Sequence, residues 1–364
     1  MRLDRFWVED FRSYERATVE LAPGVTVIIG PNGVGKTSLL EAIGVLARWE
    51  SFRGVPNEVM IRTGSAAAIV RGEAIREDRE LLVEIELPER GRSRAQVNRQ
   101  RISRRQDLGE GLVISVFAPD DLEMVKGGPA LRRRYLDETL ASLHPRHDVV
   151  RADFDKALRQ RNALLKQLGG RLAPDAALTL DVWDQRVATA GDRLGASRQE
   201  LVGALGPIVS LAYDELSGVS SEVELHLIAP WRETGLAAAL SAGRDQDIRR
   251  GVSLVGPHRD DVDIRLARLP SRTHASQGEQ RCLALSLRLA AHRHLTDRLG
   301  VAPVLLLDDV FSELDPSRSA ALLAGLPPGQ AVITSAIGVP VGAVPELVLD
   351  ISDGIAVHRD VIDG

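Results

Sequence analysis

Short runs of apolar residues dominate the first 120 positions of the chain. They have the length and the β-branched content of strands, and six of them cover residues 3–11, 17–21, 24–30, 66–75, 81–87 and 112–117. The third run leads through glycines into residues 36–49, whose apolar positions recur at helical spacing. The sequence therefore predicts a strand-rich beginning with one early helix.

Apolar positions in the middle of the chain recur every three or four residues instead. One helical pattern covers residues 147–170 and ends in a glycine pair, Gly169-Gly170, which is a typical helix stop. A second pattern covers residues 181–205. At about 1.5 Å per residue the first helix is only about 36 Å long. We therefore expect a short antiparallel helical arm and no long coiled coil.

Strand patterns return after Gly256. Residues 301–310 form an apolar run that ends in two acids, which is typical of a central parallel strand, and three weaker runs follow at 330–335, 346–351 and 354–360. Strands on both sides of the helices predict one α/β domain, residues 1–122 and 252–364. A mostly helical lobe, residues 123–251, would be inserted into it.

Composition limits the class of protein. The 364 residues are 44% hydrophobic and 27% charged, as in soluble globular proteins, and Cys282 is the single cysteine. The charged N-terminal segment is unlike a signal peptide, and no apolar run approaches membrane-spanning length. We expect a cytoplasmic protein with no membrane partner. A net charge of −5 excludes nucleic-acid binding by bulk charge, so any such contact must be local.

The stretch GPNGVGKT, from Gly30 to Thr37, fits the phosphate-loop pattern between a strand and a helix. In such a loop, glycines let backbone N–H groups surround the phosphates, and the start of the helix adds its dipole. Lys36 would reach the β- and γ-phosphates, and the Thr37 hydroxyl would bind Mg²⁺. The alternative is a glycine-rich turn with an incidental lysine. The residues expected to contact ATP here are Gly30, Pro31, Asn32, Gly33, Val34, Gly35, Lys36, Thr37 and Ser38.

The acidic partner motif is VLLLDDVFSELD. Asp308, at the end of the apolar strand, is the candidate ligand of Mg²⁺ or its water. Asp309 is the candidate for polarising the attacking water. The alternatives are an acid that supports the metal ligands without touching the metal, or a helix cap. Asp315 precedes Pro316, where a helix start is natural, so it is a candidate helix cap.

A polar turn, Ser276 to Gln280, leads into a long apolar-striped helix. It would present backbone N–H groups and a hydroxyl to an anion. The alternative is an ordinary helix start, with Ser276 as the cap and Glu279 completing a capping box.

This ordered set of three motifs resembles the ABC-type ATPase heads. In that superfamily the turn before the helix caps the γ-phosphate held by a second head, so that two ATP molecules lie between the subunits of a head-to-tail dimer. The resemblance implies an α/β P-loop head with an inserted helical lobe. It also implies that Ser276, Gln277, Gly278 and Gln280 contact the ATP of a second copy.

Four further stretches narrow the resemblance. Residues 3–14, 117–138, 256–261 and 305–315 are similar to segments of the RecF family of bacterial replication and repair ATPases. Such proteins are weak, DNA-stimulated ATPases that dimerise on ATP, bind duplex and gapped DNA, and act with RecR and RecO to load the recombinase. The resemblance places Arg12 near the nucleotide phosphates. It places Asp120 or Asp121 in the loop that senses the γ-phosphate.

Three departures from the wider superfamily favour a switch over a pump. Gln277 replaces a usual glycine, Thr334-Ser335 stands where transporters have a switch histidine, and Asp309 replaces a glutamate. The main alternative function is the ATPase subunit of an ABC transporter. A coiled-coil tether and a metabolic kinase are weaker alternatives, because the arm is short and a kinase would not need the second turn.

Arginine-rich segments are the candidate DNA contacts. Residues 90–105 contain seven arginines, and Arg132-Arg133-Arg134 form a second cluster. The alternative for both is a solvated surface. Because aromatic residues make up only 4% of the chain, backbone contact with duplex is favoured over base stacking. His258 could contact nucleotide or a partner, or be a structural histidine.

Overall fold

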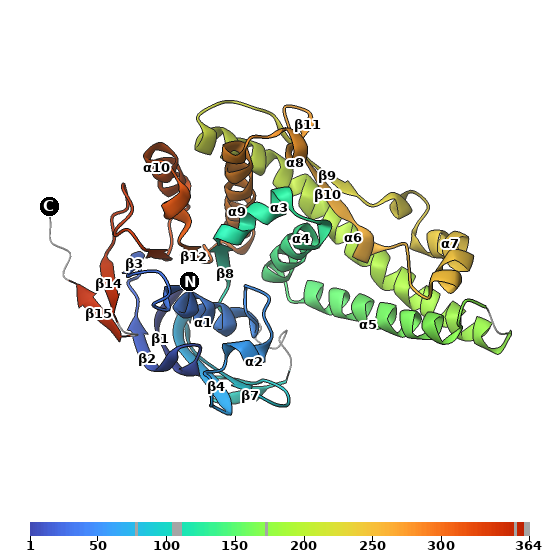
Figure 1. Cartoon of the computed structure of the whole chain (residues 1–364), viewed down its shortest axis with the longest axis horizontal. Helices are drawn as coiled ribbons and strands as arrows, with labels where there is room; N and C mark the ends of the chain where they lie inside the picture. Colours follow the sequence, from blue (N-terminus) through green and yellow to red (C-terminus); the bar gives the residue numbers. More distant parts are fainter. Residues whose placement is uncertain (77–78, 104–110, 172–173, 353–354, 360–364) are drawn as a thin grey trace. The chain divides into compact units, whose positions relative to one another are not determined.

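The structure is a computed structural model of residues 1–364 and describes all of them except 77–78, 104–110, 172–173, 353–354 and 360–364. The chain forms two compact units. The first unit comprises residues 1–121, 214–219 and 285–364, and the second comprises 122–213 and 220–284. Both strand-rich ends of the sequence therefore meet in the first unit, where blue and red strands share a sheet (Figure 1). Residues 252–284 belong to the second unit, although the sequence pattern assigned them to the α/β domain.

An antiparallel sheet in the first unit is built from the first hundred residues, in the order β2-β1-β4-β5-β6-β7. Its strands are β1 (Arg2–Phe11), β2 (Tyr14–Glu20), β4 (Ala67–Arg76), β5 (Arg79–Pro88), β6 (Arg94–Val97) and β7 (Gln100–Ile102). Buried apolar residues such as Val70, Val83 and Ile85 alternate with more exposed, mostly polar ones. This alternation is typical of a sheet with one face on the core.

A second sheet in the same unit has the order β15-β14-β3-β13-β12-β8, and all its neighbours are parallel except β14 and β15. Its strands are β3 (Val25–Ile29), β8 (Ile114–Phe117), β12 (Val304–Asp308), β13 (Ala331–Ser335), β14 (Leu347–Ser352) and β15 (Ile355–Arg359). Strands β8, β12 and β13 are buried at every position, as continuous apolar runs predict for the centre of a parallel sheet.

Helix α1 (Lys36–Arg48) is part of the core that joins the two sheets. The same cluster contains Phe6, Ile43, Val70 and Val332, so β1, α1, β4 and β13 share one apolar interior. The unit also contains α2 (Asn57–Met60), a 3₁₀ turn at Val310–Glu313 and α10 (Pro316–Gly325). Buried Gln330 connects distant segments, because its amide nitrogen donates to the carbonyls of Leu3 and Ala22 (2.7 and 2.8 Å).

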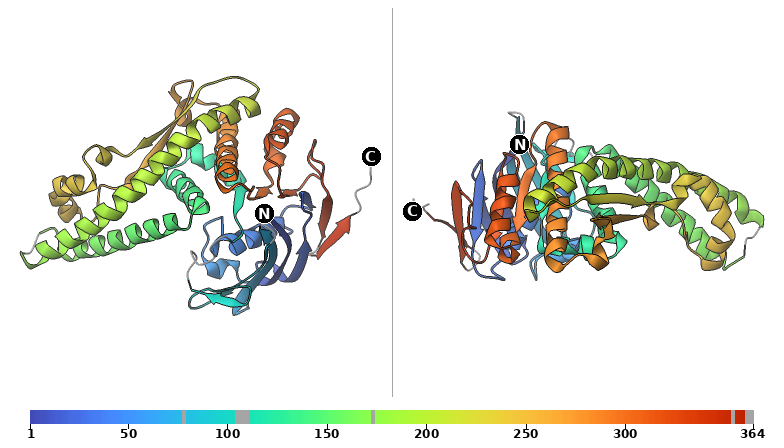
Figure 2. Two further views of the ribbon diagram at one scale, coloured as in Figure 1. Left: turned by 180° about the vertical axis from the view of Figure 1, so that it is seen from behind. Right: turned by 90° about the horizontal axis from the view of Figure 1, so that it is seen from above.

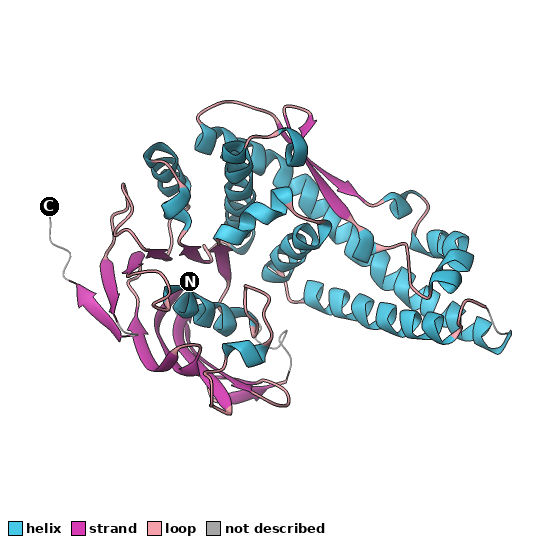
Figure 3. Ribbon diagram, viewed as in Figure 1, coloured by secondary structure: helices cyan, strands magenta, loops and turns pink. Residues whose placement is uncertain are grey.

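The second unit is mostly helical and carries a small antiparallel sheet, β11-β10-β9 (Figure 3). Its strands are β9 (Val223–Ile228), β10 (Asp261–Leu266) and β11 (Leu269–Pro270). Its helices are α3 (Glu123–Lys126), α4 (Pro129–Leu143), α5 (Arg146–Gln167), α6 (Pro174–Ser217, whose last turn belongs to the first unit), α7 (Leu236–Arg250) and α8 (Ser271–His274), with 3₁₀ turns at Pro230–Glu233 and Pro257–Arg259. A further 3₁₀ turn, Pro119–Leu122, lies at the boundary between the two units. Helix α9 (Gln277–Leu299) begins in this unit and ends in the first.

Helices α5 and α6 form the expected arm, and the end of α5 lies close to the start of α6 (Figure 2). Gly169 and Gly170 have φ of 58° and 90°, which confirms the predicted helix stop. The second helix is longer than predicted, because α6 has 44 residues and continues through Pro207. Burial of Leu205 and Val209 on either side of the proline offsets its cost of about 3 kcal/mol or more. Over the described ranges, no helix is long and apolar enough to cross a membrane.

Candidate nucleotide-binding site

The predicted phosphate loop joins the end of β3 to the start of α1, as the sequence indicated. Gly33 and Gly35 have φ of 82° and 107°, in the region that favours glycine. A Cβ at Gly35 would lie 2.7 Å from the hydroxyl of Tyr14, and one at Gly30 would lie 2.7 Å from the Ile351 carbonyl oxygen. The loop therefore needs glycine for both its conformation and its close contacts.

Lys36, the first residue of α1, turns back over this loop. Its Nζ donates to the carbonyl oxygens of Gly30 (2.7 Å) and Pro31 (2.9 Å), and burial lowers the pKa of the ammonium. Pro31 and Asn32 are exposed at the tip of the loop, and Ser38 lies in the first turn of α1. The ammonium is thus held inside the loop, where a bound phosphate would lie.

The acidic motif meets the phosphate loop at the carboxyl edge of the parallel sheet. The hydroxyls of Thr37 and Thr334 both donate to Oδ1 of Asp308, at 2.8 and 2.9 Å. Burial raises the pKa of Asp308, although both hydrogen bonds oppose the shift. A hydroxyl beside a carboxylate is the hard oxygen set that Mg²⁺ prefers, so Thr37 and Asp308 fit the predicted metal site.

Asp309 has an unusual backbone and an unsatisfied side chain. Its φ of 49° is left-handed, and its N–H donates to Thr334 Oγ1 (3.0 Å). Its Oδ1 is buried and has no hydrogen-bond partner among the described residues. Asp309 makes no side-chain cap to the following 3₁₀ turn, so the helix-cap alternative is wrong. Asp315, in contrast, accepts from the N–H of Arg318 (3.0 Å) and caps α10, as predicted.

Thr334 is the residue of this edge that the sequence did not single out for a role. Its strand, β13, lies between β3 and β12, so its hydroxyl reaches both Asp308 and the backbone of Asp309. The sequence signal for this role is the position of Thr334 near the end of the last core strand.

The second turn, at Ser276, lies in the second unit. It forms the capping box that was expected if the turn is an ordinary helix start. The N–H of Ser276 donates to Glu279 Oε2 (2.6 Å), and the N–H of Glu279 reaches Ser276 Oγ (3.4 Å). Hydrogen bonds from the Ser276 side chain and from its backbone N–H lower the pKa of the Glu279 carboxyl group. Gln277 is exposed and Gly278 partly exposed, whereas Gln280 is buried and donates to the carbonyls of Ser271 and Arg272. Gln280 therefore stabilises the turn by hydrogen bonds to the preceding helix α8.

Arg12 forms a salt bridge with a buried acid, Glu41. Its Nε and Nη2 bind both oxygens of Glu41 at 2.7 Å, and Nη1 donates to the Val59 carbonyl (2.9 Å). Glu41 is fully buried in α1 and also accepts from the hydroxyl of Ser51. The phosphate contact of Arg12 stays a prediction, and its pairing with Glu41 was missed. An acid among the apolar positions of the first helix was the available signal.

The two candidate acids of the sensing loop differ. Asp121 is buried, and its carboxylate accepts from the N–H of Ala118 (2.8 Å) and from Arg288 (2.6 Å). Asp120 is exposed. Of the two, Asp120 is therefore the residue that remains available to a ligand.

The second arginine cluster is internal to the second unit. Arg132 is buried and binds both oxygens of Asp261, and Arg133 donates to the Asp260 carbonyl (2.7 Å). Arg134 pairs with a glutamate one turn further along α4. All three guanidinium groups bind acceptors within this unit, which argues against the cluster as a DNA contact.

The first arginine cluster lies partly on the β6–β7 hairpin, whose turn at Asn98 and Arg99 has two positive φ angles. Arg90, Arg92, Arg99 and Arg101 are exposed, and Arg94 pairs with a glutamate of β5. The last two arginines of the cluster, at 104 and 105, lie outside the described residues.

His258 is a structural histidine. Its Nε2 lies 3.0 Å from the Ser253 carbonyl and its ring lies 6.1 Å from the ring of Phe154. Burial lowers the pKa of the imidazole.

Comparison with known proteins agrees with this geometry. A family model described as the RecF/RecN/SMC N terminal domain matches residues 2–332. The chain is 43% identical over 352 residues to a DNA replication and repair protein RecF of Streptomyces avermitilis, covering 92% of this chain and 93% of that one. It is 41% identical over 354 residues to the RecF of Acidothermus cellulolyticus, covering 93% and 95%.

Solved structures give the same result for the fold. The structure of the recombination mediator protein RecF-ATP in the RecFOR pathway matches with a TM-score of 0.90 and 29% identity, covering 98% of this chain and 97% of that one. An Smc head bound to the C-winged helix domain of ScpA matches with a TM-score of 0.59 at 16% identity and so shares the fold alone. The predicted α/β ATPase-head fold is confirmed. These RecF relatives are DNA replication and repair proteins, which favours the predicted family over the transporter alternative.

Proposed function

Because the chain belongs to the RecF family of DNA replication and repair proteins, we propose that it is a cytoplasmic, ATP-dependent switch that binds DNA during repair. In this proposal it hydrolyses ATP slowly, with stimulation by DNA. It binds duplex DNA near gaps or stalled forks and acts with RecR and RecO to load the recombinase.

The observation that carries the proposal is the hydrogen bond of 2.8 Å between Thr37 and Asp308. It brings the end of the phosphate loop and the end of β12 together, so that one Mg²⁺ could bind both oxygens. When bound, Mg²⁺ would neutralise charge on the β- and γ-phosphates. Lys36 would leave its two carbonyl partners to bind the same phosphates.

Asp309 supports the proposed hydrolysis. Its unpartnered carboxylate oxygen is free to accept a hydrogen bond from an attacking water. Its left-handed backbone is the kind of sparsely populated conformation that persists at functional sites. A shorter acid than glutamate fits slow turnover, as a switch requires.

The Ser276 turn supports a head-to-tail dimer. With its capping box formed, the exposed Ser276 and Gln277 stand at the positive end of the 23-residue helix α9. In the proposed dimer this end faces the γ-phosphate of ATP bound to a second copy. ATP would hold the dimer together, and hydrolysis would release it.

Sedimentation velocity tests the proposal. The protein would be measured with ATP and Mg²⁺, with and without labelled duplex DNA, beside Lys36→Met and Ser276→Arg. We expect the wild-type protein to form a dimer that binds duplex, and both variants to remain monomeric. A wild-type protein that stays monomeric with ATP and ignores DNA would contradict the proposal. Phosphate release that persists in Ser276→Arg would contradict the shared site.

A further inference from the structure

The helical arm carries a hollow that the nucleotide site does not use. It lies on the seam between α5 and α6 and is lined by polar side chains from both helices. Lys156 comes from α5, and Gln185, Arg186, Thr189 and Arg193 come from α6. All five of these side chains belong to exposed residues, so the hollow is open to a ligand.

The hollow has an excess of positive charge. Lys156, Arg186 and Arg193 line it, against one acid, Asp153. Among the described residues, no carboxylate lies within 4.0 Å of any of these three cations, whereas the buried arginines of the same unit, such as Arg161, are paired with aspartates. Unpaired cations at one place favour an anionic ligand.

The other lining groups favour phosphate over a protein side chain. Gln185 is an uncharged hydrogen-bonding residue of a type that contacts phosphate oxygens, whereas the Thr189 hydroxyl already donates to the Gln185 carbonyl (2.9 Å). The single aromatic ring, Trp183, is already covered by the Arg186 guanidinium, whose carbon lies 5.1 Å from the ring centroid. The remaining apolar lining is alanine. The hollow therefore lacks the deep apolar pocket that anchors a protein partner, and the Arg186 guanidinium occupies one face of its aromatic ring, which leaves less of the ring for stacking a base.

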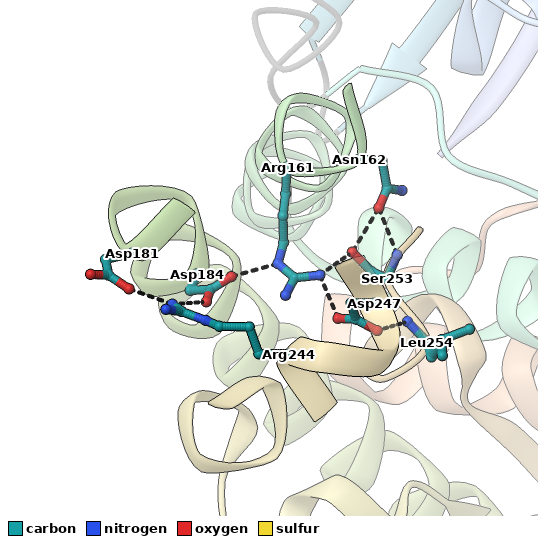
Figure 4. Close-up of polar contacts among 8 residues, drawn as sticks. All are labelled: Arg161, Asn162, Asp181, Asp184, Arg244, Asp247, Ser253 and Leu254. Carbon is teal, nitrogen blue, oxygen red and sulfur yellow. Dashed lines mark hydrogen bonds and ion pairs between the residues drawn. The ribbon is translucent and has the colours of Figure 1, made fainter. Parts of the chain in front are cut away.

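A buried ionic network fixes the two walls of the hollow (Figure 4). Arg161 of α5, one turn beyond Ala157, donates to Asp184 of α6 (2.5 Å), the residue after Trp183. The same guanidinium donates to Asp247 of α7 (2.6 Å) and to the Ser253 hydroxyl (2.7 Å). Because Arg161 is fully buried, these bonds hold α5 and α6 in one register. The cations on the outside are thus presented on a rigid surface, which lowers the entropy lost on binding.

We propose that this hollow binds the phosphate backbone of duplex DNA through Lys156, Arg186 and Arg193. The inference rests on the proposed function, because it locates a contact of the DNA binding proposed there. It names a site on the arm that is separate from the arginine-rich β6–β7 hairpin.

Salt dependence of binding tests this site. The full chain with ATP and Mg²⁺ would be titrated into a labelled duplex at several NaCl concentrations, beside a Lys156→Ala, Arg186→Ala, Arg193→Ala triple variant. Each phosphate contact contributes about 0.9 to the slope of log K against log salt, so the triple variant should lose about 2.7. Arg193→Gln alone, which leaves the Arg186–Trp183 contact in place, should lose about 0.9. Arg159→Ala, an exposed arginine of α5 outside the hollow, should leave the slope unchanged.

The outcomes separate this inference from the proposed function. A wild-type protein that binds no duplex at any salt concentration overturns both. Wild-type binding with an unchanged slope in the triple variant and in Arg193→Gln overturns the arm site alone. An unchanged slope together with lost binding of RecR would assign the hollow to an acidic protein surface and would also overturn it. ATP-driven dimerisation and the far-UV spectrum of the variants should match the wild type.

Discussion

Thr334 illustrates how a residue without reactive chemistry can set the geometry of a site. Its hydroxyl donates to Asp308 and accepts from the N–H of Asp309, so one side chain fixes both acids of the motif. The Asp309 backbone is left-handed, and this hydrogen bond helps to hold it there. Thr334 is therefore a positioning residue in the proposed site.

We predict that Thr334→Val lowers both the free energy of unfolding and the rate of ATP hydrolysis. Valine has nearly the same shape but lacks the hydroxyl, so it leaves two polar groups without their partner at a cost of about 1–3 kcal/mol. Urea unfolding should show this loss, and phosphate release should fall more than ATP affinity does. Thr334→Ser, which keeps the hydroxyl, should restore most of both. Equal turnover in Thr334→Val and the wild type would contradict the positioning role.

At the residue scale, the sequence singled out the groups that meet in the candidate site, such as Thr37 and Asp308, but not the groups that hold them in place. Lys36, Thr37 and Asp308 belong to motifs whose spacing carries the chemistry. Their partners are set by which strands become neighbours, and no local pattern encodes that β13 lies between β3 and β12. The Arg12–Glu41 pair was missed for the same reason.

At the scale of elements, the start of α9 combines a helix cap with a proposed phosphate contact in one turn. Ser276 caps the helix, and both Ser276 and Gln277 are exposed at its start. Loss of dimerisation in Ser276→Arg could therefore reflect a frayed helix or a blocked phosphate contact. A substitution that keeps the cap and changes only the charge separates these causes.

Ser276→Asp is that substitution. Aspartate caps helices about as well as serine, so we expect the free energy of unfolding to stay within about 0.5 kcal/mol of the wild type. Its negative charge would repel the γ-phosphate of the second copy, so ATP-driven dimerisation should be lost. Ser276→Ala is the matched control, with about 1 kcal/mol lost from the cap and weaker but measurable dimerisation. Dimerisation of Ser276→Asp at the wild-type ATP concentration would contradict a phosphate contact.

Elements with a strong pattern were predicted well, and their extents less well. The apolar runs at β3, β12 and β13 and the stop at Gly169-Gly170 are all present. The length of α6 was not predicted, because Pro207 interrupts the helical pattern. The helix continues beyond the proline because its apolar residues are buried in the tertiary structure. Likewise, nothing in the local sequence indicates that Arg132 is internal.

At the scale of the whole molecule, the phosphate loop and the Asp308 motif lie in one compact unit and the Ser276 turn in the other. Ligand binding to one unit stabilises that unit by mass action. In the monomer, the residues proposed to bind ATP and Mg²⁺ all lie in the first unit. Thermal unfolding can therefore test which unit ATP stabilises.

We expect ATP with Mg²⁺ at about 100 times its Kd to stabilise the monomer by about 2.7 kcal/mol. For a first unit of about 200 residues, this corresponds to a rise in Tm of about 5–10 °C. Differential scanning calorimetry of Ser276→Asp, which should remain monomeric, would measure it. If the two units unfold separately, only one transition should move. Lys36→Met is the control without a shift, and an equal shift in Lys36→Met would contradict the assigned phosphate contact.

The position of β3 has a consequence for synthesis of the protein. Both strands that hydrogen-bond to β3, β13 and β14, lie more than 300 residues further along the chain. At about 5–20 residues per second, a ribosome needs roughly 15–60 s to make them after β3 has been translated. Until then the strand that carries the phosphate loop has no neighbour in its sheet. Because the acidic motif at the end of β12 precedes both of these strands in the chain, it has always been made before β3 gains a neighbour in its sheet.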